Sequence, residues 1–151
     1  MSRRQSFGPY DLAERIGVGA LGEVYGAVAR RDGRVVALKR LLASSADDAE
    51  VIAMLEAEAS VARTLDHPSI ARLQDIGVVH GVHYIAYDFV HGRDLRAIHE
   101  RALRGDGKSA PERVPLDVAC SIAVHVAEAL DYAHRRADDR GRLLGLVHRD
   151  V

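Results

Sequence analysis

The chain has 151 residues, of which 48% are hydrophobic and 28% are charged, and this is enough to enclose the core of one soluble globular domain. Its 21 basic and 22 acidic side chains almost cancel, which excludes the overall positive field that draws a protein to nucleic acid or anionic lipid. The single cysteine, Cys120, excludes an internal disulfide and a multi-thiolate metal site, and it is typical of a reducing compartment. No apolar run approaches the roughly 20 residues of a membrane span, so we expect a cytoplasmic protein without a membrane segment.

The first part of the chain consists of predicted strands separated by glycine and polar turns. Strands are expected over residues 10–17, 23–30 and 34–40, and Arg31-Asp32-Gly33 is the expected hairpin turn between the last two. Consecutive strands joined by short turns form an antiparallel meander.

A helix is predicted next, ending near residue 65, because strong helix formers follow one another there without glycine or proline. Three side chains ahead of it can accept the free amide protons of a first turn, and these candidate N-caps are Ser44, Ser45 and Asp47. The pair His67-Pro68 ends the helix. Two further strands are expected over residues 70–79 and 82–88, joined by a turn at His80-Gly81.

The second half of the chain is predominantly helical. Helices are predicted over residues 95–104 and 116–135, with a loop rich in glycine, proline and charge between them. Apolar residues recur at helical spacing along the long helix at Ile122, Val126, Leu130 and Ala133. We therefore expect an α+β fold: a five-stranded antiparallel sheet with one helix in residues 10–88, a hinge in residues 89–94, and the start of an incomplete helical lobe in residues 95–151.

Residues 16–24 read Ile-Gly-Val-Gly-Ala-Leu-Gly-Glu-Val and fit the pattern G-x-G-x-x-G-x-V. Glycines at these places let the backbone pass close to phosphates without obstruction by side chains. A glycine-rich hairpin without a ligand and a dinucleotide-binding turn are the alternatives. A dinucleotide turn needs the third glycine to open a helix, whereas residues 23–28 have strand character, so the pattern favours a flap over phosphates. Val24 would then lie against an adenine ring.

The third predicted strand carries a lysine in a chain that otherwise uses arginine. Alternation along a strand places Val35, Ala37 and Lys39 on one face. The small side chain of Ala37 leaves room for a purine, and the ammonium group of Lys39 can reach phosphate oxygens. The alternative is an edge strand with a solvated lysine.

The predicted helix favours the first interpretation, because Glu58 falls within its apolar stripe while Glu56 points away from it. A carboxylate on a buried helix face is costly unless it is paired. We therefore expect an ion pair between Glu58 and Lys39, and the alternative is a glutamate that reaches out to solvent.

Near its end the sequence reads Val147-His148-Arg149-Asp150, and an aspartate in this setting could accept a hydroxyl proton or orient it toward a phosphoryl group. Taken with the glycine flap, the strand lysine and the helix glutamate, in this order, the chain resembles the eukaryotic-type protein kinase family from Tyr10 onward. The resemblance implies that the glycines cover the phosphates of ATP, that Lys39 holds the α- and β-phosphates and pairs with Glu58, and that Asp150 is the catalytic base.

Residues 84–95 are similar to the hinge of that family. The resemblance implies that Tyr87 is the gatekeeper, that backbone groups of Asp88 and Val90 meet the adenine edge, and that the carboxylate of Asp94 lies near the ribose. The ATP-binding residues that it implies are Ile16, Gly17, Val18, Gly19, Gly22, Val24, Ala37, Lys39, Tyr87, Asp88, Val90 and Asp94.

The chain departs most from the family's pattern at the two protein ligands for magnesium. In the family these ligands are an asparagine five residues beyond Asp150 and an Asp-Phe-Gly aspartate, and both are expected after Val151. We therefore expect Mg²⁺ to accompany ATP. Because its two protein ligands are not among the 151 residues, we also expect this chain to be inactive by itself. No metal site is expected among the residues present, since His80 and His83 flank a hairpin turn without a third ligand.

The function implied by the resemblance is transfer of the γ-phosphate of ATP to a hydroxyl of a protein substrate, serine or threonine rather than tyrosine. Two alternatives remain: a non-catalytic nucleotide-binding or scaffold module of kinase fold, and a small-molecule kinase of related fold. The sequence indicates no oligomeric state.

Overall fold

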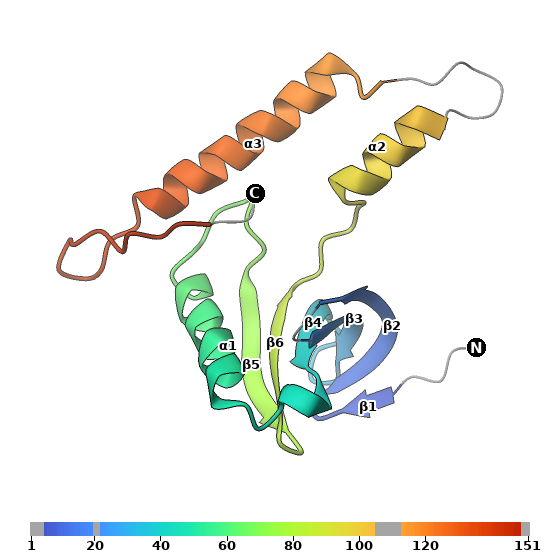
Figure 1. Cartoon of the computed structure of the whole chain (residues 1–151), viewed down its shortest axis with the longest axis vertical. Coiled ribbons are helices and arrows are strands. Elements are labelled where there is room, and N and C mark those ends of the chain that lie inside the picture. Colours follow the sequence, from blue (N-terminus) through green and yellow to red (C-terminus); the bar gives the residue numbers. More distant parts are fainter. Residues whose placement is uncertain (1–4, 20–21, 105–112, 149–151) are drawn as a thin grey trace. The chain divides into compact units, whose positions relative to one another are not determined.

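The computed structural model describes residues 5–19, 22–104 and 113–148, which form two compact units (Figure 1). The first unit extends to Val90 and the second begins at His91. Asp150, expected to be the catalytic base, lies outside the described residues, as does Arg149.

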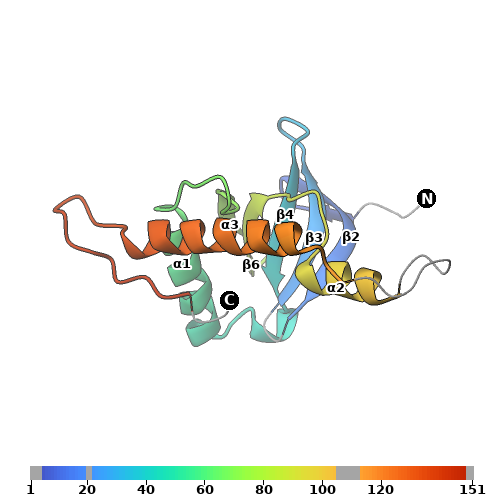
Figure 2. The same cartoon turned by 90° about the horizontal axis from the view of Figure 1, so that it is seen from above.

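The first unit is built on one antiparallel sheet of six strands in the order β1-β2-β3-β4-β6-β5. The strands are β1 (Gln5–Phe7), β2 (Tyr10–Val18), β3 (Gly22–Ala29), β4 (Val35–Leu41), β5 (Leu73–Val79) and β6 (Val82–Asp88). Figures 1 and 2 both show β2, β3 and β4 side by side, as their pairing requires. The meander expected from the sequence is confirmed.

Two details of the strand prediction are wrong. The sheet has six strands where five were expected, because the short strand β1 pairs with β2 across a turn in which Gly8 has φ 53°. A three-residue strand is too short to show an alternation in the sequence. In addition, β5 begins at Leu73 rather than at residue 70, because the amide of Ile70 closes a turn onto the carbonyl of His67 at 3.0 Å.

Helix α1 (Ala49–Ala62) is capped by Asp48, whose carboxylate accepts hydrogen bonds from the amides of Glu50 and Val51. The expected caps were therefore wrong. Ser44 and Ser45 belong instead to a 3₁₀ turn, η1 (Ala43–Ser45), which leaves Asp48 as the last extended residue before the helix. The helix also ends three residues earlier than expected.

Both faces of the sheet are covered by apolar side chains. On one face the buried cluster consists of Phe7, Tyr10, Leu12, Ala27, Val36, Leu38, Val79, Tyr84 and Ala86. On the other face α1 packs on β5 and β6, and the buried residues are Leu41, Val51, Leu55, Ala59 and Ile85. Helix α1 thus forms a second layer on one face of the sheet.

The carboxylate of Asp75 links two tyrosines on the first face of the sheet. Asp75 on β5 accepts hydrogen bonds from the hydroxyls of Tyr10 at 2.9 Å and Tyr84 at 2.8 Å. Burial raises the pKa of both tyrosines, and the hydrogen bond to Asp75 adds to the effect.

The second unit contains α2 (Leu95–Arg104) and α3 (Leu116–His134), followed by a bridge between Ala137 and Leu143. The helices expected over residues 95–104 and 116–135 are confirmed to within one residue. No residue of α3 is buried, and Val124 and Val126 on it are exposed. Within the part of the chain that the structure describes, no helix is long and apolar enough to cross a membrane.

The central position of β4 predicts a large cost for shortening its buried side chains. Leu38 is 0% exposed, whereas Val35 on the opposite face is 46% exposed. We expect Leu38→Ala to lower the free energy of unfolding by about 2–5 kcal/mol, because it leaves a cavity, and Val35→Ala to change it by about 0.5 kcal/mol. Urea unfolding followed by circular dichroism measures both, and equal losses would contradict the assignment of the two faces.

Candidate functional site

Lys39 and Glu58 form the ion pair that the sequence predicts. The ammonium nitrogen Nζ of Lys39 lies 2.6 Å from Oε2 of Glu58, and their side chains are 35% and 39% exposed. Glu56, on the same helix, is exposed. The pair is therefore sheltered on one side by α1 and still accessible to a ligand on the other.

The alternation of β4 explains where this lysine points. Val36 and Leu38 are buried in the cluster on the first face, so Ala37 and Lys39 lie on the face that carries α1. On the neighbouring strand β3, Val24 pairs with Lys39 and Gly26 pairs with Ala37. Small and apolar residues thus surround one cation, a surface suited to a flat ring and its phosphates.

The glycine-rich segment forms the hairpin between β2 and β3. Gly17 pairs with Val24, and the amide of Gly19 donates to the carbonyl of Gly22 at 2.8 Å. A Cβ added at Gly22 would lie 2.5 Å from the carbonyl oxygen of Arg40, so only glycine fits there. At Gly17 the nearest atom would be 3.6 Å away, on Val24, which is ordinary contact. Ile16 and Val18 are exposed.

A polar cluster that the sequence analysis missed supports this hairpin from the other face. The carboxylate of Glu23 accepts hydrogen bonds from Arg15 at 2.7 Å, Arg40 at 3.1 Å and the hydroxyl of Tyr25 at 3.0 Å. The hydrogen bond from Arg15 is the main cause that holds the pKa of Glu23 below its usual value, and Arg40 and Tyr25 add to it. The guanidinium group of Arg40 also stacks over the rings of Tyr25 and Phe7. Opposite charges at facing strand positions were the available signal.

Tyr87 contacts the ion pair directly. It pairs with Ala37 across β4 and β6, which places it on the α1 face, and its hydroxyl donates to Oε1 of Glu58 at 2.9 Å. Burial, then the charge of Glu58 and this hydrogen bond, raise the pKa of Tyr87. The resemblance placed Tyr87 at the site, but its contact with Glu58 was not predicted.

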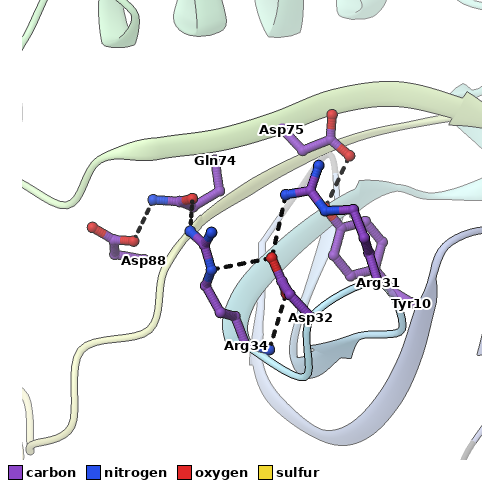
Figure 3. Close-up of polar contacts among 7 residues, drawn as sticks. All are labelled: Tyr10, Arg31, Asp32, Arg34, Gln74, Asp75 and Asp88. Atoms are coloured by element: carbon purple, nitrogen blue, oxygen red, sulfur yellow. Dashed lines mark hydrogen bonds and ion pairs between the residues drawn. The ribbon is translucent and has the colours of Figure 1, made fainter.

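Asp88 ends β6 and is held by two hydrogen bonds. Its amide donates to the carbonyl of Arg72 at 2.9 Å, and its carboxylate accepts from the side-chain amide of Gln74 at 2.6 Å. The same glutamine accepts from Arg34 at 3.4 Å, and Arg34 pairs with Asp32 (Figure 3). Polar contacts therefore connect the β3–β4 turn to the residue that leads out of the sheet.

A cavity of about 180 Å³ lies beside these polar residues. Its lining includes Tyr10 and Asp75, which Figure 3 labels, and Val36. Tyr10 and Val36 belong to the buried cluster on the face opposite Lys39. This cavity is therefore separate from the candidate site.

The remaining site residues differ in their placement. Val90 is 72% exposed at the end of the first unit. Asp94 belongs to the second unit, where its carboxylate accepts a hydrogen bond from the amide of Ala97 at 2.7 Å and so caps the start of α2.

The fold and this arrangement of glycine hairpin, strand lysine and helix glutamate define a class of protein. The chain matches the family model described as the protein kinase domain over residues 10–151. It therefore belongs to the protein kinase domain family, and its fold is protein-kinase-like.

Individual relatives agree with this class. Tyrosine-protein kinase MasK of Myxococcus xanthus is 31% identical over 150 residues, which are 97% of this chain and 22% of MasK. Serine/threonine-protein kinase PknD of Mycobacterium tuberculosis is 36% identical over 145 residues, which are 96% of this chain and 19% of PknD. The crystal structure of the M. tuberculosis PknI kinase domain matches with a TM-score of 0.71 and 33% identity, covering 100% of this chain and 54% of that one. The chain thus spans about a fifth of these curated relatives and about half of the solved kinase domain.

The close backbone approach at Gly22 generates a prediction about the hairpin. We expect Gly22→Ala to lower the free energy of unfolding by about 1–3 kcal/mol, since the added methyl group must displace the backbone of Arg40. Gly17→Ala, where the new methyl group meets only Val24, should cost less than about 1 kcal/mol. Urea denaturation of the two variants tests the difference, and a loss at Gly22 as small as the one expected at Gly17 would show that Gly22 tolerates a side chain.

Proposed function

We propose that this chain is the ATP-binding front part of a protein kinase domain of the serine/threonine type, which transfers the γ-phosphate of ATP to a protein hydroxyl. The observation that carries the proposal is the Lys39–Glu58 ion pair, set beside a glycine hairpin that passes close to its neighbouring strand. ATP supplies the phosphoryl group, and Mg²⁺ neutralises its charge.

The residues of the first unit fit the phosphate end of such a nucleotide. Lys39 would hold the α- and β-phosphates, because its ammonium is partly exposed and is kept in place by Glu58. The backbone of the hairpin at Gly17, Gly19 and Gly22 would cover the phosphates, where no side chain obstructs a close approach.

The adenine end would lie along the exit from β6. The amide of Asp88 already donates to Arg72, so its carbonyl is the group we assign to the adenine edge, with the backbone of Val90 as a second contact. Val24, Ala37 and Tyr87 would line the ring. We assign the carboxylate of Asp94 to the ribose and propose residues 10–88, 89–94 and 95–151 as first lobe, hinge and start of the second lobe.

Asp150 would accept or orient the proton of the attacking hydroxyl. The family's two protein ligands for magnesium would follow Val151 in a complete domain. The names of the relatives include both serine/threonine and tyrosine kinases, and PknD supports the preference for serine or threonine. We also propose that the substrate is a protein and that the location is cytoplasmic.

The mechanism predicts which lysine is essential. In a version of the protein extended to a complete kinase domain, we expect Lys39→Met to reduce phosphorylation of a generic protein substrate by at least about 10²-fold, because phosphate positioning is lost while packing is kept. Lys108→Met removes the chain's other lysine and should leave the rate unchanged. Asp150→Asn should also reduce the rate while ATP binding is largely retained. Turnover near that of the unmodified protein in Lys39→Met would overturn the kinase mechanism.

A second prediction concerns the 151 residues alone. We expect no appreciable phosphoryl transfer and only weak nucleotide binding, because the groups that would hold Mg²⁺ are not among them. The exposed apolar residues of α3 should also make the chain prone to aggregate. An assay of ATP turnover together with thermal unfolding checks this, and robust turnover with a cooperative transition would contradict it.

A further inference from the structure

The carboxylate of Glu58 is bound at both of its oxygens. Oε2 lies 2.6 Å from the ammonium of Lys39, and Oε1 accepts the hydroxyl of Tyr87 at 2.9 Å. We propose that Tyr87 is a positioning residue, whose hydroxyl is the second anchor that keeps Glu58 turned toward Lys39 and thereby sets the phosphate-binding position of the lysine. This inference rests on the nucleotide-binding function proposed above.

The ion pair needs such an anchor because of its exposure. Both side chains are long and more than a third exposed, and an ion pair of this kind contributes little by itself, since water screens it and both side chains lose rotamer freedom. A second hydrogen bond to the other oxygen fixes the plane of the carboxylate. Only one orientation of Glu58 then satisfies both donors.

Tyr87 is held in place by strand pairing and by the packing of its ring. Its strand β6 lies inside the sheet, where Tyr87 pairs with Ala37 on one side and with Leu73 on the other. Its ring packs on the buried cluster beneath α1, which includes Leu55 and Ile85. A hydroxyl on a packed aromatic ring with two rotatable bonds is a well-defined donor.

The same strand offers a matched control. Tyr84 also donates its hydroxyl to a carboxylate, that of Asp75 at 2.8 Å, but it lies in the cluster on the opposite face. Tyr84→Phe therefore removes a comparable hydrogen bond without touching Lys39 or Glu58, whereas Tyr87→Phe removes one that does.

The test compares two ligands that differ only in phosphates. The protein extended to a complete kinase domain, with the original sequence and with each variant, is titrated with ATP and with adenosine, and dissociation constants are taken from NMR shifts. We expect Tyr87→Phe to weaken ATP binding about three- to tenfold, as loss of one hydrogen bond to a charged group at a partly exposed site predicts. Adenosine binding should stay unchanged, because the aromatic ring that would line the adenine is kept. Tyr84→Phe should change the binding of neither ligand, and Lys39→Met should weaken the binding of ATP but not that of adenosine.

Several results would overturn the inference. Equal weakening of ATP and adenosine would mean that the hydroxyl of Tyr87 acts on the adenine pocket rather than on Glu58, and unchanged ATP binding would mean that the hydroxyl positions nothing. In a Glu58→Ala background Tyr87→Phe should have no further effect, so a full effect there would also contradict it. If the original chain binds ATP no better than adenosine and Lys39→Met changes nothing, the proposed function itself fails and the inference with it. Circular dichroism spectra confirm that each variant is folded.

Discussion

The first unit depends on the alternation of side chains along β4. This strand lies between β3 and β6, and side chains on its two faces pack into two different apolar clusters. Val36 and Leu38 anchor it in one apolar cluster, and Leu41 anchors it in the other beneath α1. Because a strand cannot rotate when both faces are packed, Lys39 has a single direction in which to point.

Each face of the sheet also contains a carboxylate that receives two side-chain donors, one of them a tyrosine of β6. Asp75 accepts the hydroxyls of Tyr10 and Tyr84 on one face, and Glu58 accepts Tyr87 and Lys39 on the other. Strand β6 supplies one tyrosine to each, since positions three apart in a strand lie on opposite faces. The difference is the partner: on the first face it is another tyrosine, and on the second it is a cation that is still partly exposed.

Local signals made several features predictable. The turns at Gly33 and at His80-Gly81 follow from residue types that accept positive φ, and these three residues do have φ of 74°, 49° and 82°. Strand β1 and the cap at Asp48 were not predicted. A strand of three residues is too short to show periodicity. Neighbouring serine and aspartate residues can all cap a helix, and the backbone conformation ahead of the helix decides which of them does.

The sequence by itself determined the family, the alternation of β4 and the pairing of Lys39 with Glu58 rather than a neighbour, because each depends on spacing within one strand or one helix. Only the tertiary structure decided what surrounds that pair. The register between β4 and β6 brings Tyr87 to Glu58, and the register between β3 and β4 brings Glu23 to Arg40 and leaves no room for a side chain at Gly22. Strand register is set by the packing of the whole sheet, so contacts between strands cannot be obtained from any one segment.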